Sequence, residues 1–142
     1  MKPIKTALCS FGMSGGVFHA PFLQQHPGFE FYAVFERTKN LAETKYPAVK
    51  TFRSLEEMLE DEAIELLIVN TPNYTHSEYA KMGLEAGKHV VVEKPMTIRS
   101  SEAFELIEIA SGFQFQTKVD CAPYVAQLWE EKPAKYIYPI PA

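Results

Sequence analysis

The stretch IKTALCSFGMSGGVFHAPFLQQH (residues 4–26) decides the fold class, because it sets a glycine-containing turn between an apolar run and a helical pattern. Residues 4–11 are predicted to form a strand, and residues 15–26 a helix that Pro21 interrupts or kinks. A dinucleotide-binding turn has the pattern Gly-x-Gly-x-x-Gly at such a place. The three positions are occupied here by Ser10, Gly12 and Gly15. Gly12 would let a pyrophosphate approach the helix N-terminus, although a purely structural turn explains the pattern equally well.

The alternation of apolar runs and helical patterns continues to about residue 112. Further strands are predicted at residues 29–35, 49–52, 65–70 and 89–93. Further helices are predicted at residues 41–46, 54–61, 75–87 and 100–112. The last three helices are predicted to be capped. Ser54 is the predicted N-cap of the helix at 54–61 and Thr75 that of the helix at 75–87, and Gly87 marks the end of the latter. The runs ELLIVN and HVVVE are apolar on both faces, which is typical of parallel strands covered by helices on both sides. The predicted fold class is therefore α/β, with a doubly wound parallel sheet of the Rossmann type.

The regular pattern ends before the chain does. Residues 1–119 are assigned to a dinucleotide-binding domain, with a possible strand at 113–119, and residues 120–142 to an irregular tail that contains several prolines. Residues 136–142 are expected to be extended or disordered, because proline removes hydrogen-bond donors and restricts its neighbours.

Composition narrows the classes of function. A net charge of −4 gives no general reason to expect binding to nucleic acid or to an anionic membrane, and no apolar run approaches the length that spans a bilayer. Cys9 and Cys121 are far apart, so neither a disulfide nor a zinc site is expected, and a cytoplasmic location follows. No pair of histidines has the spacing of metal ligands with supporting carboxylates, and no metal is predicted.

Candidate binding residues follow the predicted strands. Glu36 comes 21 residues after Gly15, where an acidic residue takes the ribose hydroxyls of a dinucleotide; a solvated strand end is the alternative. Arg37 and Lys39 come next and suit a 2′-phosphate, so both NAD and NADP stay open. A local cluster of exposed charge explains these two residues nearly as well.

Two rigid turns, TPNYTH (71–76) and EKP (93–95), stand at the ends of the strands predicted at residues 65–70 and 89–93. The carboxyl ends of parallel strands share one edge of a sheet, so these turns and the glycine turn are expected to form one crevice. Asn70, Thr71 and Asn73 offer short hydrogen-bonding groups that suit a ribose or a carboxamide.

The segments FGMSGGVFHAPFL, TPNYTH and EKPMT resemble the Gfo/Idh/MocA oxidoreductases, over about residues 3–111. The resemblance implies hydride transfer between a nicotinamide and a carbon that bears oxygen, and a second α/β domain that holds a sugar or polyol. Carried over by position, the implied cofactor-binding residues are Ser10, Phe11, Gly12, Met13, Gly15, Glu36, Arg37, Thr71, Pro72, Asn73, His76, Glu93 and Pro95. Lys94 is implied to touch the substrate, where an ammonium polarises an oxygen or helps proton transfer; a solvated lysine is the alternative. His19 also matches the family, and either lines the cofactor or packs.

Nothing after Gly112 resembles that second domain, and 30 residues are too few to form it. A truncation or a frame change near residue 112 would give such a tail. Three hypotheses follow: an NAD(P)-dependent oxidoreductase that is truncated and poorly active alone, a non-catalytic nucleotide-binding module, and a self-associating structural remnant. A sugar or polyol is expected to bind only if a second domain or chain completes the site. An apolar surface left without its partner domain predicts a homo-oligomer.

Overall fold

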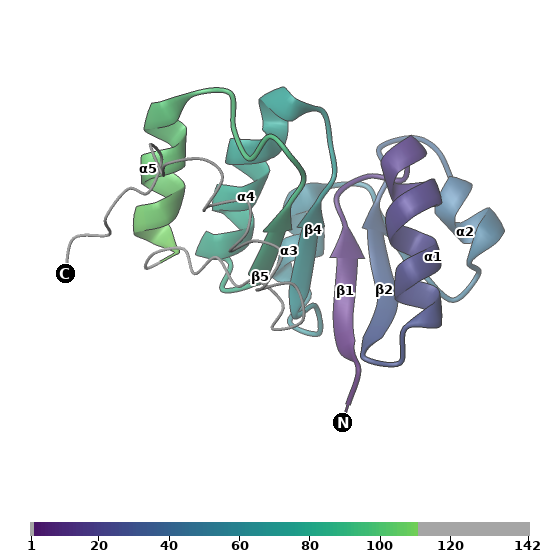
Figure 1. Ribbon diagram of the computed structural model, residues 1–142. Helices are drawn as coiled ribbons and strands as arrows, with labels where there is room; N and C mark the ends of the chain where they lie inside the picture. Colours follow the sequence, from purple (N-terminus) through teal and green to yellow (C-terminus); the bar gives the residue numbers. More distant parts are fainter. Residues whose placement is uncertain (1, 111–142) are drawn as a thin grey trace, which may run out of the picture. The chain divides into compact units, whose positions relative to one another are not determined.

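The computed structural model describes residues 2–110, which fold around one parallel sheet (Figure 1). The sheet has five strands in the order β3-β2-β1-β4-β5. Their bounds are Ile4–Leu8 (β1), Phe29–Phe35 (β2), Lys50–Phe52 (β3), Leu66–Val69 (β4) and His89–Val92 (β5). Because every strand pair is parallel, the carboxyl ends of the strands meet at one edge, at the top of Figure 1. The prediction of a doubly wound α/β sheet is confirmed.

Helices connect successive strands. Their bounds are Gly15–His19 (η1, a π-helical turn), Ala20–Gln25 (α1), Leu41–Lys45 (α2), Leu55–Glu60 (α3), Asn73–Thr75 (η2, a 3-10 turn), His76–Glu85 (α4) and Ser100–Ile109 (α5). Every strand and helix predicted up to residue 110 is present, with ends that differ by a few residues. Pro21 does not interrupt its helix. The Ala20 N–H donates to Gly15 O in a π-type bond, and Pro21, which has no N–H, follows in the first turn of α1.

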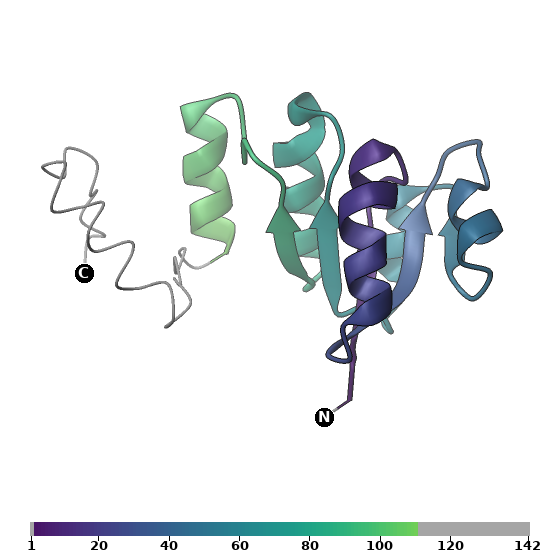
Figure 2. The same ribbon diagram turned by 45° about the vertical axis from the view of Figure 1, so that its right-hand side comes forward.

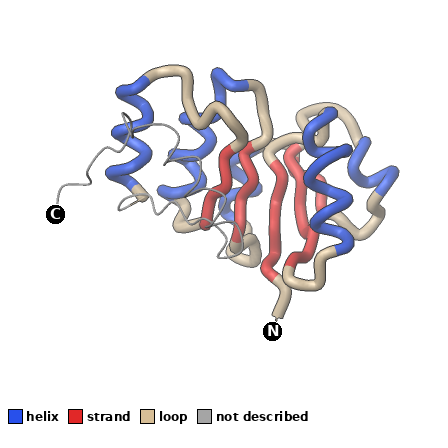
Figure 3. Tube along the Cα trace, in the orientation of Figure 1, coloured by secondary structure: helices blue, strands red, loops and turns tan. Residues whose placement is uncertain are grey.

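Helices cover the sheet on both faces, so that two hydrophobic layers form (Figures 2 and 3). Successive residues of a strand point to opposite faces, and neighbouring residues of β1 therefore enter different layers. Leu8 packs in the layer beneath α1 and α2, whereas Ala7 and Cys9 pack in the layer beneath α3, α4 and α5. Strand β4 alternates in the same way. Burying one side chain such as Leu8 stabilises the fold by roughly 1.5–3 kcal/mol.

Strand β5 departs from the prediction that it is buried on both faces. Among the described strands it pairs only with β4, so it lies at an edge of the sheet. Val90 and Val92 are half-buried in the layer beneath α4, but Val91 points the other way and is 49% exposed. The apolar run did not reveal this, because a strand at an edge can be as hydrophobic as a central one.

Only some of the predicted helix caps are present. Ser54 Oγ accepts a hydrogen bond from the Glu57 N–H at 3.3 Å, as expected of an N-cap. The Thr75 side chain does not cap α4, because its hydroxyl contacts Thr71 Oγ1 and Pro72 O instead. Helix α5 also begins without a side-chain cap. Gly87 has a φ of 72° just past α4, a conformation that glycine adopts at little cost.

The possible strand at residues 113–119, the proposed tail at 120–142 and Cys121 lie outside the described residues, so the domain boundary stays a prediction. Between residues 2 and 110, no helix combines the length and apolar character needed to cross a membrane. The same part of the chain holds no group of three or more His, Cys, Asp or Glu side chains placed to bind a metal ion.

Candidate functional site

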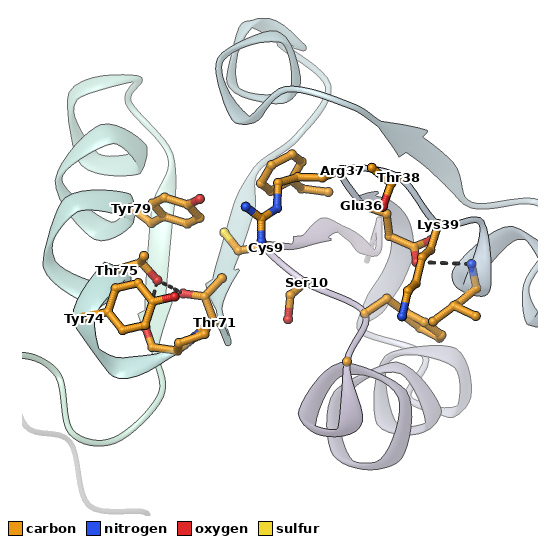
Figure 4. A pocket seen from close by; sticks show the side chains of 15 residues that line it. Cys9, Ser10, Glu36, Arg37, Thr38, Lys39, Thr71, Tyr74, Thr75 and Tyr79 are labelled. Carbon is orange, nitrogen blue, oxygen red and sulfur yellow. Dashed lines mark hydrogen bonds between the residues drawn. The ribbon is translucent and has the colours of Figure 1, made fainter.

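A pocket of about 370 Å³ opens at the carboxyl edge of the sheet, where ligands bind in open α/β folds. Residues from the ends of β1 and β2 form one wall, and the segment from the end of β4 into α4 forms the other (Figure 4). The predicted cofactor residues that line it are Ser10, Phe11, Gly12, Glu36, Arg37, Thr71 and Pro72. The turns after β1, β2 and β4 therefore meet in one crevice, whereas residues 93–95, which were predicted to share it, do not line it.

The turn after β1 is fixed by Asn70. The Asn70 side chain accepts a hydrogen bond from Ser10 N through Oδ1 (3.0 Å) and donates one to Ser10 O through Nδ2 (2.9 Å). Ser10 Oγ donates in turn to Asn70 O (3.1 Å). Asn70 is 4% exposed, and its amide is occupied by this turn instead of facing a ribose or carboxamide. A glycine at position 10 would lack the hydroxyl bond, so the departure from the glycine pattern has a structural reason.

The two glycines of the turn have different surroundings. A Cβ on Gly15 would lie 2.4 Å from Ser10 O and 2.9 Å from Asn70 Nδ2, so only glycine fits there. A Cβ on Gly12 would meet nothing within 4 Å. Gly12 is exposed and lines the pocket, so the space in front of its backbone is open. This is the geometry that lets a phosphate group approach a backbone closely.

Glu36 binds the protein's own backbone. Its Oε1 accepts a hydrogen bond from Leu41 N (3.1 Å) and its Oε2 one from Ala42 N (3.0 Å), so that the carboxylate caps the start of α2. The residue is 7% exposed. Its predicted partner was a ribose, but both carboxylate oxygens already have backbone donors.

Cationic side chains therefore dominate this end of the pocket. Figure 4 shows the Arg37 guanidinium pointing between the two walls, and Lys39 on the wall that also holds Glu36. Within residues 2–110 neither Arg37 nor Lys39 forms an ion pair. Arg53 donates hydrogen bonds of 2.7 Å to both Glu36 O and Lys39 O, and this holds the loop that carries the two cations.

The opposite wall is formed by Thr71, Pro72, Tyr74, Thr75 and Tyr79. Tyr74 is 73% exposed, whereas burial of the Tyr79 phenol raises its pKa. Cys9 forms part of the pocket floor, and burial raises the pKa of its thiol far above the ordinary value. Since the thiolate is the reactive form, Cys9 is unsuited to act as a nucleophile.

The Glu93–Pro95 turn lies outside this pocket and contacts two histidines. His19 Nε2 lies 2.7 Å from Glu93 Oε1, and this hydrogen bond lowers the pKa of the Glu93 carboxyl. His76 is 1% exposed, with Nδ1 2.7 Å from Pro95 O and Nε2 2.8 Å from Thr71 O. Lys94 is exposed and is joined to Pro95 by a cis peptide bond. The His76 ring thus contacts the protein's own backbone, and His19 contacts Glu93.

The predicted residues therefore divide into two groups. The first group lines the pocket and consists of Ser10, Phe11, Gly12, Glu36, Arg37, Thr71 and Pro72. The second group does not line it and consists of Met13, Gly15, Asn73, His76, Glu93, Lys94 and Pro95. Sequence reasoning missed Arg53, and it did not single out Tyr79. No sequence signal marks Arg53, because its role is to hold the loop that ends at Asn40, 13 residues earlier in the chain.

A fold and pocket of this kind define a dinucleotide-binding Rossmann domain, and known proteins agree. Residues 4–120 match the Gfo/Idh/MocA model, described as an oxidoreductase family with an NAD-binding Rossmann fold. An uncharacterized oxidoreductase of Schizosaccharomyces pombe is 48% identical over 79% of this chain and 32% of its own length. The scyllo-inositol 2-dehydrogenase (NADP(+)) of Bacillus subtilis is 37% identical over 70% of this chain and 28% of its own. The crystal structure of a Bacteroides fragilis protein described as a "putative oxidoreductase" superposes with a TM-score of 0.74 at 53% identity, over 77% of this chain and 32% of that one.

The chain belongs to the Gfo/Idh/MocA oxidoreductase family and carries the family's NAD(P)-binding Rossmann domain. It spans about a third of the length of the curated relatives it matches.

Proposed function

We propose that this chain binds NADP in preference to NAD, and that it does so without turnover unless a second domain or chain completes the site. The observation that carries the preference is the engagement of Glu36. An acidic residue at this position selects NAD when its carboxylate is available for the ribose hydroxyls. Here each carboxylate oxygen already accepts a hydrogen bond from the start of α2, which leaves fewer lone pairs for a ribose, and the next residues that line the pocket are Arg37, Thr38 and Lys39.

A 2′-phosphate suits these groups. A guanidinium binds phosphate through paired hydrogen bonds, and an ammonium adds a second positive charge. The name of the relative from Bacillus subtilis also specifies NADP. The open space before Gly12 suits the pyrophosphate. Ser10, Phe11, Met13 and Gly15 shape that turn, and Thr71, Pro72 and Asn73 form the facing loop.

We also propose Lys94 as the residue that would touch a sugar or polyol. The nicotinamide of a bound cofactor supplies the hydride chemistry, and the exposed ammonium of Lys94 is suited to bind and polarise a substrate oxygen. Turnover needs the reacting carbon held still in a site that excludes water. Lys94 and Pro95 are exposed within the described part of the chain, so we expect slow or absent hydride transfer by this chain alone.

Calorimetric titration of the 142-residue chain with NADP, NADPH, NAD and NADH tests these proposals. We expect saturable binding of the phosphorylated pair, with NAD and NADH at least tenfold weaker, which corresponds to about 1.4 kcal/mol. Arg37→Ser should remove most of this difference and leave the affinity for NAD nearly unchanged. Failure of all four ligands to bind would refute the function. Equal affinity for NAD and NADP would refute the role of Arg37.

Self-association is a further proposal. Val91, Ile98 and Phe104 are 49%, 60% and 70% exposed, and they follow one another from β5 to α5. Exposed apolar groups of this kind favour association. A sharp monomer peak in sedimentation velocity at high concentration would contradict it. Cys9 is buried and forms no disulfide within residues 2–110, and we propose a cytoplasmic location that fractionation of cells would test.

A further inference from the structure

We propose that His19 and His76 are positioning residues that hold the Glu93–Pro95 turn from two sides and so fix the backbone that carries Lys94. The importance of Lys94 rests on the proposed function. The contacts themselves do not, and they can be tested without any ligand.

The first contact joins the glycine turn to the end of β5. His19 ends η1, the helical turn that begins at Gly15, and its Nε2 lies 2.7 Å from Glu93 Oε1 although 74 residues separate the two. The side chains are only 20% and 33% exposed, so water competes weakly for this bond. A carboxylate only accepts hydrogen bonds, and His19 therefore donates through Nε2. Residue 93 is tied through this contact to the segment that builds the phosphate-binding turn.

The second contact comes from the start of α4. His76 Nδ1 lies 2.7 Å from Pro95 O, and Nε2 lies 2.8 Å from Thr71 O. Carbonyl oxygens only accept, so a neutral ring donates to one of them and a protonated ring donates to both. In either form the ring lies between the turn after β4 and the turn after β5. Since His76 is 1% exposed, its position is set by packing.

The other contacts of this turn are few: Lys94 N donates to Glu93 Oε2 at 3.3 Å, and Met96, just after it, packs against the core. Its last bond to the sheet runs from Glu93 N to Val69 O at 2.9 Å, and β5 is an edge strand among the described residues. Lys94 and Pro95 are exposed. Lys94 lies directly between residue 93, which His19 holds, and residue 95, which His76 holds. A flexible ammonium is placed only as well as its backbone, so loss of either histidine should displace Lys94.

Amide hydrogen exchange of the ligand-free chain provides the main test, because β5 offers a matched pair of amides. Glu93 N donates to Val69 O at the end next to the turn, and His89 N donates to Glu65 O at the other end. In His19→Leu we expect exchange of the Glu93 amide to accelerate about tenfold and that of His89 to stay unchanged. His19→Gln places an N–H donor at a similar reach and should restore most of the protection. Unchanged Glu93 exchange in His19→Leu, or the same acceleration in His19→Gln, would overturn the proposal.

His76 is tested by a conservative variant, because a large apolar replacement at a buried site can unfold the chain. His76→Asn keeps a donor near the position of Nδ1 and loses the one toward Thr71. We expect it to protect the Glu93 amide better than His76→Ala does. Equal protection in the two folded variants would remove His76 from the proposal.

A ligand comparison then separates this proposal from the proposed function. Adenosine 2′,5′-bisphosphate carries only the adenine half of NADP, and the Glu93–Pro95 turn lies outside the pocket that suits this half. We expect His19→Leu to weaken NADP binding several-fold and to leave binding of the bisphosphate unchanged. Equal weakening of both ligands would overturn the positioning role. If the wild type binds neither ligand, the proposed function fails, while the exchange of Glu93 still decides the contacts of the turn.

Discussion

Replacing Glu36 tests whether this carboxylate stabilises the fold or waits for a ligand. Glu36→Ala removes two hydrogen bonds to the backbone, to Leu41 N and Ala42 N, at a site that is 7% exposed. A hydrogen bond to a charged group contributes about 1.5–3 kcal/mol, and a lost helix cap costs about 1 kcal/mol. Ala42 is fully buried, whereas Leu41 is 49% exposed and water can replace part of its bond. We therefore expect the free energy of unfolding to fall by about 2–4 kcal/mol.

Urea unfolding followed by circular dichroism measures this change. In a separate thermal melt, a loss of that size should lower the melting temperature of a domain of about 110 residues by roughly 8–16 °C. Glu36→Gln keeps one acceptor oxygen and loses the charge, so about half of the loss is expected. Arg37→Ala is the matched control, because this neighbouring side chain is exposed and makes no ion pair within residues 2–110. Its effect on stability should stay within about 0.5 kcal/mol.

The outcome distinguishes two roles. Suppose that the free energy of unfolding of Glu36→Ala lies within about 0.5 kcal/mol of the wild-type value and that the variant no longer binds NAD. The carboxylate then binds the ribose, and the cap does not contribute to stability. The reasoning that leads from the cap to a preference for NADP would then be wrong. A large loss of stability with the NADP preference retained would support both steps.

Further predictions concern the glycine turn and the Glu93 contact. Gly15→Ala should destabilise the chain by more than about 2 kcal/mol in urea unfolding, because its Cβ would lie 2.4 Å from Ser10 O. Gly12→Ala is its control: it should leave stability within about 0.5 kcal/mol, since nothing lies within 4 Å of its Cβ, and equal losses in the two variants would contradict this. The His19 hydrogen bond lowers the pKa of Glu93, so the stability that this bond contributes is present above the ordinary glutamate pKa of about 4.3 and disappears as the pH falls through the lowered value. Glu93→Gln should therefore be less stable than the wild type at pH 6 and equally stable at the acid end of a pH series; a gap that persists in acid would disprove the linkage.

Local sequence patterns were sufficient to predict most of the fold. The apolar run of β1 and the helical pattern of α4 are properties of neighbouring residues, and such local signals predicted the order of strands and helices. The glycine turn, Ser54 as an N-cap and Gly87 after α4 are likewise local signals. Together they predicted a doubly wound sheet, and with it the edge at which the pocket lies.

Tertiary structure decided what each polar residue does. Glu36 directly follows β2 and lines the pocket, but only the fold brings its carboxylate to the N–H groups of α2. The pairing of His19 with Glu93 joins segments 74 residues apart, and the exposure of Val91 depends on which strand lies at the edge. A sequence pattern reports periodicity over a few turns or strands. The partner of a polar group depends instead on packing between distant segments, and that is fixed only when the whole sheet has formed.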